Sequence, residues 1–163
     1  MHYRLAPENG REDDVPEEEV AQELDQRFIE EIKERIRTSP FHTWAGMELV
    51  SIGGGLAEVA LELQDHHFNP QRIVHGGIIA AIADTSIGLA LRSMLRAGMT
   101  HRTAQLNVHF LAKGEGNRII ARGRSLHLGQ RMGYGEAEVS DSDGRLLARA
   151  TATFIVLPAP GAF

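Results

Sequence analysis

Apolar side chains recur at helical spacing near the start of the chain. Between Pro16 and Arg37 they return every three or four positions between runs of Glu, Lys and Arg, which predicts an amphipathic helix. Asp14 and Pro16 are typical helix-start signals, and Ser39-Pro40 is a typical stop. We expect this helix to cover a sheet edge or to pack on another subunit, with a lid over a site as the alternative.

Alternating apolar and polar positions predict strands along much of the remaining chain. In the run 104–110, Ala104, Leu106, Val108 and Phe110 point one way and polar residues the other, which indicates a half-buried strand. A turn at 142–144 predicts a hairpin between the last two strands. The predicted strands cover residues 56–63, 104–110, 118–128, 133–140 and 148–156, with one more before the glycines at 53–55.

A second helix is predicted from Gly76 to Leu95, and it is apolar on nearly every face. We therefore expect a sheet to bury it on nearly every side. The order of two strands, one long helix and four strands is an α+β pattern without repeated βαβ units, so the sheet should be antiparallel. The expected division is a flexible tail at 1–14, the amphipathic helix within 15–40, one domain at 41–158 and a short tail at 159–163.

One acidic residue, Asp84, interrupts the apolar helix. Aspartate is a poor helix-interior residue, and an ionised carboxylate in apolar surroundings costs several kcal/mol unless it is paired. Folding alone therefore does not favour Asp84, although an arginine, a backbone donor or a solvent gap could accommodate it. Burial would raise its pKa and make it a stronger base, which is typical of functional sites.

The start of the same helix is the glycine pair Gly76-Gly77. Glycine lets a ligand approach the backbone closely, and first-turn N–H groups have no intrahelical acceptor, so this end suits a developing oxyanion. Eight residues separate Gly76 from Asp84, or about 12 Å along the axis, which is too far for both to meet one carbonyl. A two-fold homodimer with antiparallel helices would place each Asp84 opposite the partner's Gly76.

Composition narrows the function classes. The charge of −5 gives no general attraction to nucleic acid or to an anionic membrane. No cysteine is present, which excludes disulfides, thiolate metal sites and a cysteine nucleophile, and we expect neither metal nor cofactor. No apolar run has the length of a signal peptide core or a membrane span, so the expected location is cytoplasmic.

Asn69, His75-Gly76-Gly77 and Asp84 together resemble the PaaI-type hotdog-fold thioesterases, and the similarity extends over about 41–157. The resemblance implies a hotdog fold, dimers with two shared sites, frequently paired into tetramers, and hydrolysis of an acyl-CoA thioester. It implies Gly76 N–H as the oxyanion donor and Asp84 as general base or nucleophile. Asn69 would orient water or the thioester, His75 would shape the site, and Thr103 would assist Asp84.

Coenzyme A also requires contacts for its phosphates. Between Lys113 and Arg131 there are five basic residues against one acid, a local charge of +4 that suits a phosphate-rich ligand. We expect Gly77, Lys113 and Arg131 to contact the substrate. Two alternatives stay open: an acyl-CoA-binding module without turnover, which Asp84 argues against, and an enoyl-CoA hydratase, for which no Asp–His pair is evident.

Overall fold

A computed structural model describes residues 26–160, with side chains described from Phe28 onward. The tail predicted at 1–14, residues 15–25 of the amphipathic segment, and the last three residues of the tail predicted at 159–163 lie outside this range. The helical elements are α1 (Gln26–Thr38), α2 (Pro40–Ala45), the short 3₁₀ turn η2 (Asp65–His67) and α3 (Gly76–Arg92). The strands are β1 (Met47–Gly53), β2 (Leu56–Glu62), β3 (Met99–Phe110), β4 (Arg118–Leu128), β5 (Met132–Asp141) and β6 (Leu146–Pro158).

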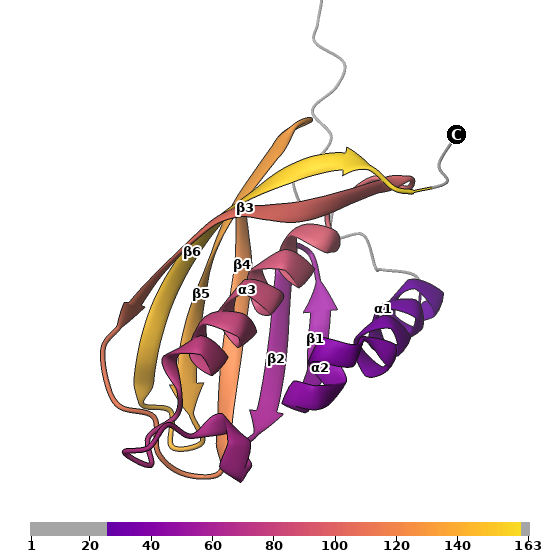
Figure 1. Ribbon diagram of the computed structural model, residues 1–163. Helices are drawn as coiled ribbons and strands as arrows, with labels where there is room; N and C mark the ends of the chain where they lie inside the picture. Colours follow the sequence, from indigo (N-terminus) through magenta and orange to yellow (C-terminus); the bar gives the residue numbers. More distant parts are fainter. Residues whose placement is uncertain (1–25, 161–163) are drawn as a thin grey trace, which may run out of the picture.

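The six strands form one antiparallel sheet in the order β1-β2-β4-β5-β6-β3. The sheet curves around α3, which lies on its concave side, and α1 and α2 lie beside the β1 edge (Figure 1). This arrangement confirms the predicted hotdog fold with an extra N-terminal helix. No helix in residues 26–160 is long and apolar enough to cross a membrane.

Glycines in the middle of the sheet let α3 sit close to it. A Cβ on Gly123 of β4 would lie 2.2 Å from the carbonyl oxygen of Ser86, inside the helix backbone. A Cβ on Gly135 of β5 would lie 2.6 Å from the side chain of Ile87. Because these positions carry no side chain, the helix packs directly against the strand backbone.

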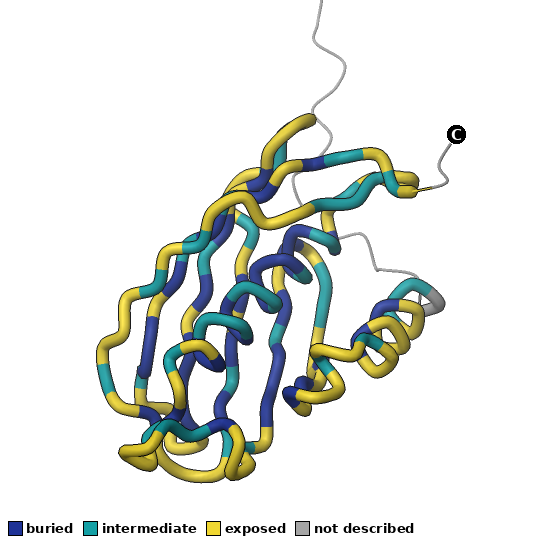
Figure 2. Tube along the Cα trace, viewed as in Figure 1, coloured by how far each residue is buried: buried dark blue, intermediate teal, exposed yellow. Residues whose placement is uncertain are grey.

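The main core lies between α3 and the strands behind it, which are largely buried in Figure 2. Strand β6 follows the predicted alternation, since the apolar residues at 148, 150, 152, 154 and 156 are buried and Arg149 is exposed. In β2 the apolar residues facing α3 are also buried, but so is Ala60 on the opposite face. The predicted pattern therefore holds best where α3 covers the sheet.

The prediction for β3 as a half-buried strand was wrong in part. Leu106 and Val108 are only partly buried, while Ala104 and Phe110 are exposed, Phe110 by 56%. The reason is position, since β3 is the last strand of the sheet and extends past the cover that α3 provides (Figure 2). No element in residues 26–160 covers these apolar residues fully.

The segment around Trp44 also differs from expectation, because it forms helix α2 where the sequence indicated only a connection. Helix α1 ends at Thr38, and Pro40 occupies the first turn of α2, where its missing N–H costs nothing. The apolar face of α1 packs through Ile32 and Ile36 against Leu49 of β1. The N-terminal helix thus covers one end of the sheet.

The close contact between α3 and β4 can be tested with Gly123→Ala. The added methyl group would overlap the backbone at Ser86, so we expect the free energy of unfolding to fall by about 3 kcal/mol or more in urea denaturation. Gly129→Ala is the matched control, because its Cβ would meet chiefly the end of the His127 side chain and should cost at most about 0.5 kcal/mol. Equal stability of the two variants would contradict this packing.

Candidate active site

Helix α3 is less buried than the prediction of cover on nearly every side, because one side of it is not covered. Gly77, Ala80, Ala81, Asp84 and Thr85 are exposed or only partly buried, and their spacing places them in one stripe along the helix. The buried residues of α3 face the sheet. Asp84 thus lies on the uncovered side of an otherwise buried helix.

The carboxylate of Asp84 lines a pocket of about 330 Å³ bounded by α1, α2, α3 and β3. The Thr103 hydroxyl donates to it and lies 3.0 Å from Oδ1 and 3.1 Å from Oδ2. Burial raises the pKa of Asp84, and the hydrogen bond from Thr103 opposes part of this shift. The pair predicted from the sequence is therefore in contact, in surroundings that make the carboxylate more basic.

A bulge in β3 brings Thr103 toward the helix. The register with β6 shifts between Thr103 and Gln105, so Ala104 is the extra residue. In a regular strand Thr103 and Leu106 would point to opposite faces, but here Thr103 contacts Asp84 and Leu106 packs on the core. The alternation predicted from Ala104 onward therefore does not continue back to Thr103.

Two histidines that the sequence analysis did not place, His42 and His101, line the same pocket. Burial lowers the pKa of both, and the nearby charge of Arg92 lowers that of His101 further. Both histidines are therefore neutral near pH 7. In the described part of the chain, neither of them forms a hydrogen bond with Asp84. His42 comes from α2, a helix that the sequence pattern did not predict, so no local signal pointed to it.

The start of α3 carries a free backbone donor. His75 is the N-cap, and its Nδ1 accepts the Gly77 N–H at 2.9 Å. The Gly76 N–H has no acceptor in the described part of the chain. Because Nδ1 acts as an acceptor, the neutral ring carries its proton on Nε2, which remains available as a donor. Gly77 therefore supports the cap, and Gly76 supplies the open donor.

Asn69, Gly76 and Lys113 line a second pocket of about 370 Å³. The Asn69 Oδ1 accepts the backbone N–H groups of Gln71 at 2.9 Å and Ile73 at 3.3 Å, so the side chain shapes its loop. Its amide NH₂ has no partner in the described residues and remains available to a ligand. Asn69 therefore shapes its own loop, and its role toward water or the thioester stays a prediction.

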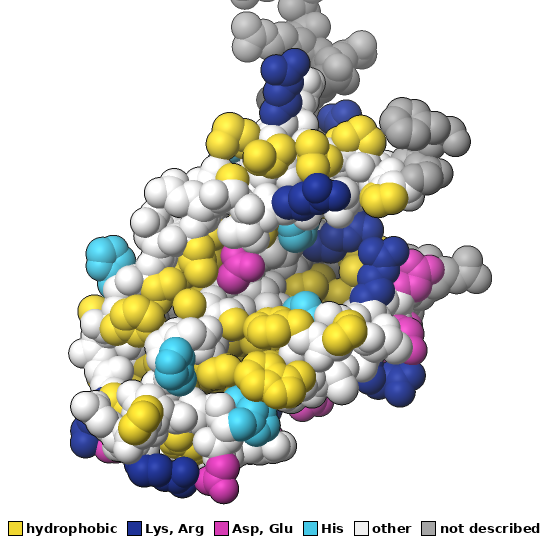
Figure 3. Space-filling model, viewed as in Figure 1, with side chains coloured by type: hydrophobic (Ala, Val, Ile, Leu, Met, Phe, Trp, Pro, Cys, Tyr) yellow, Lys and Arg dark blue, Asp and Glu magenta, His cyan; other side chains and the backbone are white. Residues whose placement is uncertain are grey.

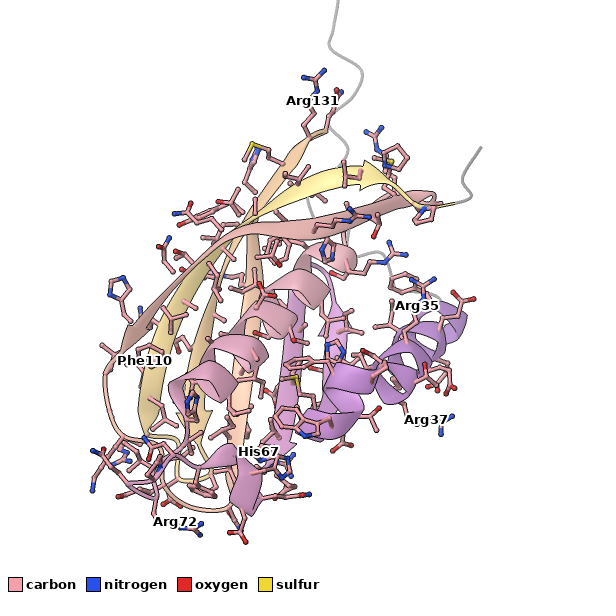
Figure 4. The ribbon with its side chains drawn as sticks, in the orientation of Figure 1. Arg35, Arg37, His67, Arg72, Phe110 and Arg131 are labelled. Atoms are coloured by element: carbon pink, nitrogen blue, oxygen red, sulfur yellow. The ribbon has the colours of Figure 1, made fainter. Side chains whose placement is uncertain are left out.

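The buried His67 lies beside this loop (Figure 4). Its carbonyl oxygen accepts the His75 N–H at 2.8 Å, and its Nδ1 accepts the Gln64 N–H at 2.9 Å. These bonds tie η2 to the start of α3. No pattern in the sequence assigned a role to His67, and its burial and hydrogen bonds indicate a structural role.

The structure brings the predicted residues together in two separate groups. Asp84 and Thr103 line the first pocket, and Asn69, Gly76 and Lys113 line the second. The rise of α3 puts about 12 Å between the levels of Gly76 and Asp84. Each pocket of a single chain therefore holds half of the predicted chemistry: a base in one and an unpaired N–H donor in the other.

The basic stretch between Lys113 and Arg131 is mostly neutralised, which corrects the expected local charge. Four of its five basic side chains form ion pairs, three of them with acids on neighbouring strands, and two of these acids lie far away in the sequence. The pairs are Lys113–Glu115, Arg118–Glu62, Arg122–Glu58 and Arg124–Glu136. Arg131 lies at the outer end of the β4–β5 hairpin and lines neither pocket (Figure 4), so its contact with substrate stays a prediction.

Comparison with known proteins adds an independent observation. The sequence profile described as Thioesterase superfamily matches residues 71–148, which include α3 and the Asp84 stripe. The medium/long-chain acyl-CoA thioesterase YigI of Salmonella typhimurium is 30% identical over 132 residues, which cover 72% of this chain and 85% of that protein.

Solved structures share the fold. A conserved protein of Pseudomonas aeruginosa superposes with a TM-score of 0.71 at 29% identity, covering 76% of this chain and 98% of that one. The PaaI protein of E. coli, from its phenylacetic acid degradation operon, superposes with a TM-score of 0.73 at 18% identity, covering 80% and 94%. Each superposition covers nearly the whole of the solved structure, so the two folds are shared along their full length.

The hydrogen bond between Thr103 and Asp84 can be tested by titration. Because this bond lowers the pKa of Asp84, Thr103→Val should raise that pKa further, and Thr103→Ser should return it toward the wild-type value. Carboxyl-carbon NMR of labelled protein would follow the titration directly. An unchanged Asp84 titration in Thr103→Val would show that the hydroxyl does not act on the carboxylate.

Proposed function

The chain belongs to the thioesterase superfamily and is a thioester hydrolase, and from that premise we propose that it hydrolyses acyl-CoA thioesters at a site shared by two subunits. Water attacks the thioester carbonyl, the carbon–sulfur bond breaks, and a free acid and coenzyme A leave. The acyl-CoA specificity named for YigI supports this substrate class. The observation that carries the proposal is a carboxylate of raised pKa, Asp84, on the uncovered stripe of α3. The same helix has an unpaired N–H donor at its start, within the described residues.

The shared site follows from the position of these groups on one rigid helix. Two copies of α3 lying antiparallel would bring each Asp84 level with the partner subunit's helix start. The uncovered stripe carries small side chains at Gly77, Ala80 and Ala81, so a second copy of α3 could approach it closely. The poorly covered apolar residues of β3 offer additional surface for the same interface. A homodimer is the smallest active unit in this proposal, and the tetramer implied by the resemblance stays a prediction.

Each group has a distinct part in the reaction. Asp84 accepts the proton of the attacking water, or attacks directly to form an anhydride that water then cleaves. The Gly76 N–H of the opposite subunit stabilises the oxyanion, and the Asn69 amide, which lines the same pocket, is a further donor in this proposal. Lys113 lines the Gly76 pocket, and in this proposal it binds a phosphate of coenzyme A.

The function is tested with a panel of acyl-CoA thioesters and detection of the released thiol, using wild type and Asp84→Asn. The asparagine side chain of this variant keeps the size of the aspartate and its contact with Thr103 but cannot act as a base. We expect kcat to fall by about a hundredfold to ten-thousandfold for every substrate that the wild type hydrolyses.

Calorimetric binding of a slowly hydrolysed thioether analogue of acyl-CoA provides the control, and Asp84→Asn should bind it as the wild type does. A wild type that binds the analogue but hydrolyses no thioester would support the non-catalytic binding module. Release of thiol by Asp84→Asn at the wild-type rate would remove Asp84 from the mechanism.

The oxyanion donor is tested with the pair Gly76→Pro and Gly76→Ala. Proline is accepted at the first position of a helix, and His75 already has the extended backbone that precedes proline, with ψ of 133°. Both variants place a Cβ near Phe110, but only proline removes the N–H. We expect kcat to be lower by about a hundredfold or more in Gly76→Pro than in Gly76→Ala. Equal activity of the two variants would exclude this donor.

Subunit mixing tests whether the site is shared. Asp84→Asn and Gly76→Pro chains, co-expressed with different tags, should form mixed dimers with one intact and one doubly defective site. A random mixture should then recover about a quarter of the wild-type activity, although each variant alone is inactive. Failure to recover activity in isolated mixed dimers would place the whole site within one chain.

A further inference from the structure

Most of the arginines without an acidic partner lie at the Asp84 pocket. In the described part of the chain, seven arginines form ion pairs with acids: Arg37, Arg72, Arg118, Arg122, Arg124, Arg145 and Arg149. Arg35, Arg92 and Arg102 form none within residues 26–160, and all three line this pocket, whereas the equally unpaired Arg96 and Arg131 do not. Figure 3 shows basic side chains around a hollow between α1 and the outer part of β3.

Arg92 is the most enclosed of the three arginines in the pocket. Its guanidinium lies 5.1 Å from the ring centre of Phe28 and donates one hydrogen bond, at 3.4 Å, to the carbonyl of Met99. Burial lowers its pKa, the charge of Arg35 lowers it further, and Glu31 acts in the opposite direction. A guanidinium has five N–H donors, so most of those of Arg92 remain without a partner in the described residues.

This arrangement is unfavourable for an empty pocket. Arg35 on α1 and Arg92 on α3 repel each other; Glu31 offsets part of this effect on Arg92, but no acid in residues 26–160 forms an ion pair with either arginine. The neighbouring His42 and His101 are neutral and supply no compensating charge. Asp84 accepts the hydrogen bond from Thr103, and in the proposed mechanism it acts on the thioester. An anionic group bound between the two guanidinium groups would remove the repulsion and satisfy their donors.

We propose that this pocket binds the acyl chain of the substrate and that Arg92 and Arg35 recognise a carboxylate at the far end of that chain. The preferred substrates are then CoA monothioesters of dicarboxylic acids. This inference rests on the proposed function, because it assumes that the thioester carbonyl lies at Asp84. It goes further by naming the chemical class of the acyl group.

The position of Arg92 favours an acyl carboxylate over a phosphate of coenzyme A. Arg92 is eight residues beyond Asp84 on α3, about 12 Å along the axis, a distance that a short dicarboxylic chain can span. The walls between them include the buried apolar side chains of Ile32, Ile36 and Phe154, which suit methylene groups. The phosphates lie beyond the long pantetheine arm on the other side of the thioester, where the Gly76 pocket supplies Lys113.

Matched thioester pairs test the proposal. Adipoyl-CoA and hexanoyl-CoA have the same chain, except that a carboxylate replaces the terminal methyl group, and suberoyl-CoA and octanoyl-CoA form a longer pair. We expect the wild type to show a kcat/KM at least about tenfold higher for the dicarboxylic member of the better-fitting pair. The difference should shrink at high salt if it comes from charge.

Arg92→Gln and Arg35→Gln should remove this preference while leaving hexanoyl-CoA hydrolysis within about threefold of wild type. Arg35 is exposed, so its replacement keeps the test valid even if Arg92→Gln does not fold. Arg37→Gln is the matched control, because Arg37 lies on the same helix, points away from α3 (Figure 4) and pairs with Glu34. It should keep the wild-type preference.

The outcomes separate this inference from the proposed function. Hydrolysis of both members of each pair at equal rates would overturn the inference and leave the thioesterase function intact. Equal losses for adipoyl-CoA and hexanoyl-CoA in both arginine variants would assign the arginines to a phosphate of coenzyme A and also overturn it. A wild type that hydrolyses no thioester would overturn both proposals.

Discussion

The burial of α3 against the curved sheet is the contact on which the rest of this structure depends. Gly123 and Gly135 allow the helix backbone to lie directly on the strands, so one side of α3 is held rigidly. The opposite side carries a stripe of small residues around Asp84 that the sheet does not cover. A carboxylate on that stripe has a fixed position and only partial access to water, which is what a positioned base requires.

The same rigidity keeps the two halves of the predicted chemistry apart. The hydrogen-bonded carboxylate and the unpaired Gly76 N–H belong to one straight helix and line different pockets. Bending α3 to join them would break the helix and its core contacts. Pairing two copies of the chain joins them without deforming either copy, which is why we favour assembly as the solution.

Charge is distributed unevenly over the fold. Acids on β2 and β5 neutralise the arginines of β4, and most of the described arginines that remain unpaired line the pocket beside Asp84. Part of that pocket wall comes from α1, which lies before the residues 71–148 matched by the family profile. The family profile therefore covers Gly76 and Asp84, the proposed reacting groups, and an additional helix shapes the space where the acyl group is expected to bind.

The sequence alone determined the strands, the apolar helix, and Gly76 and Asp84 as groups on that helix, because hydrophobic periodicity and residue spacing are local properties. It also predicted Thr103 beside Asp84, through the resemblance to a family. Only the tertiary structure revealed the bulge at Ala104, the poor cover of β3 and the pocket wall formed by α1 and α2. It also showed that Arg118 and Arg122 of β4 form ion pairs with acids that lie far away in the chain. Burial and ion pairing depend on which elements meet in space, and a one-dimensional pattern does not contain that information.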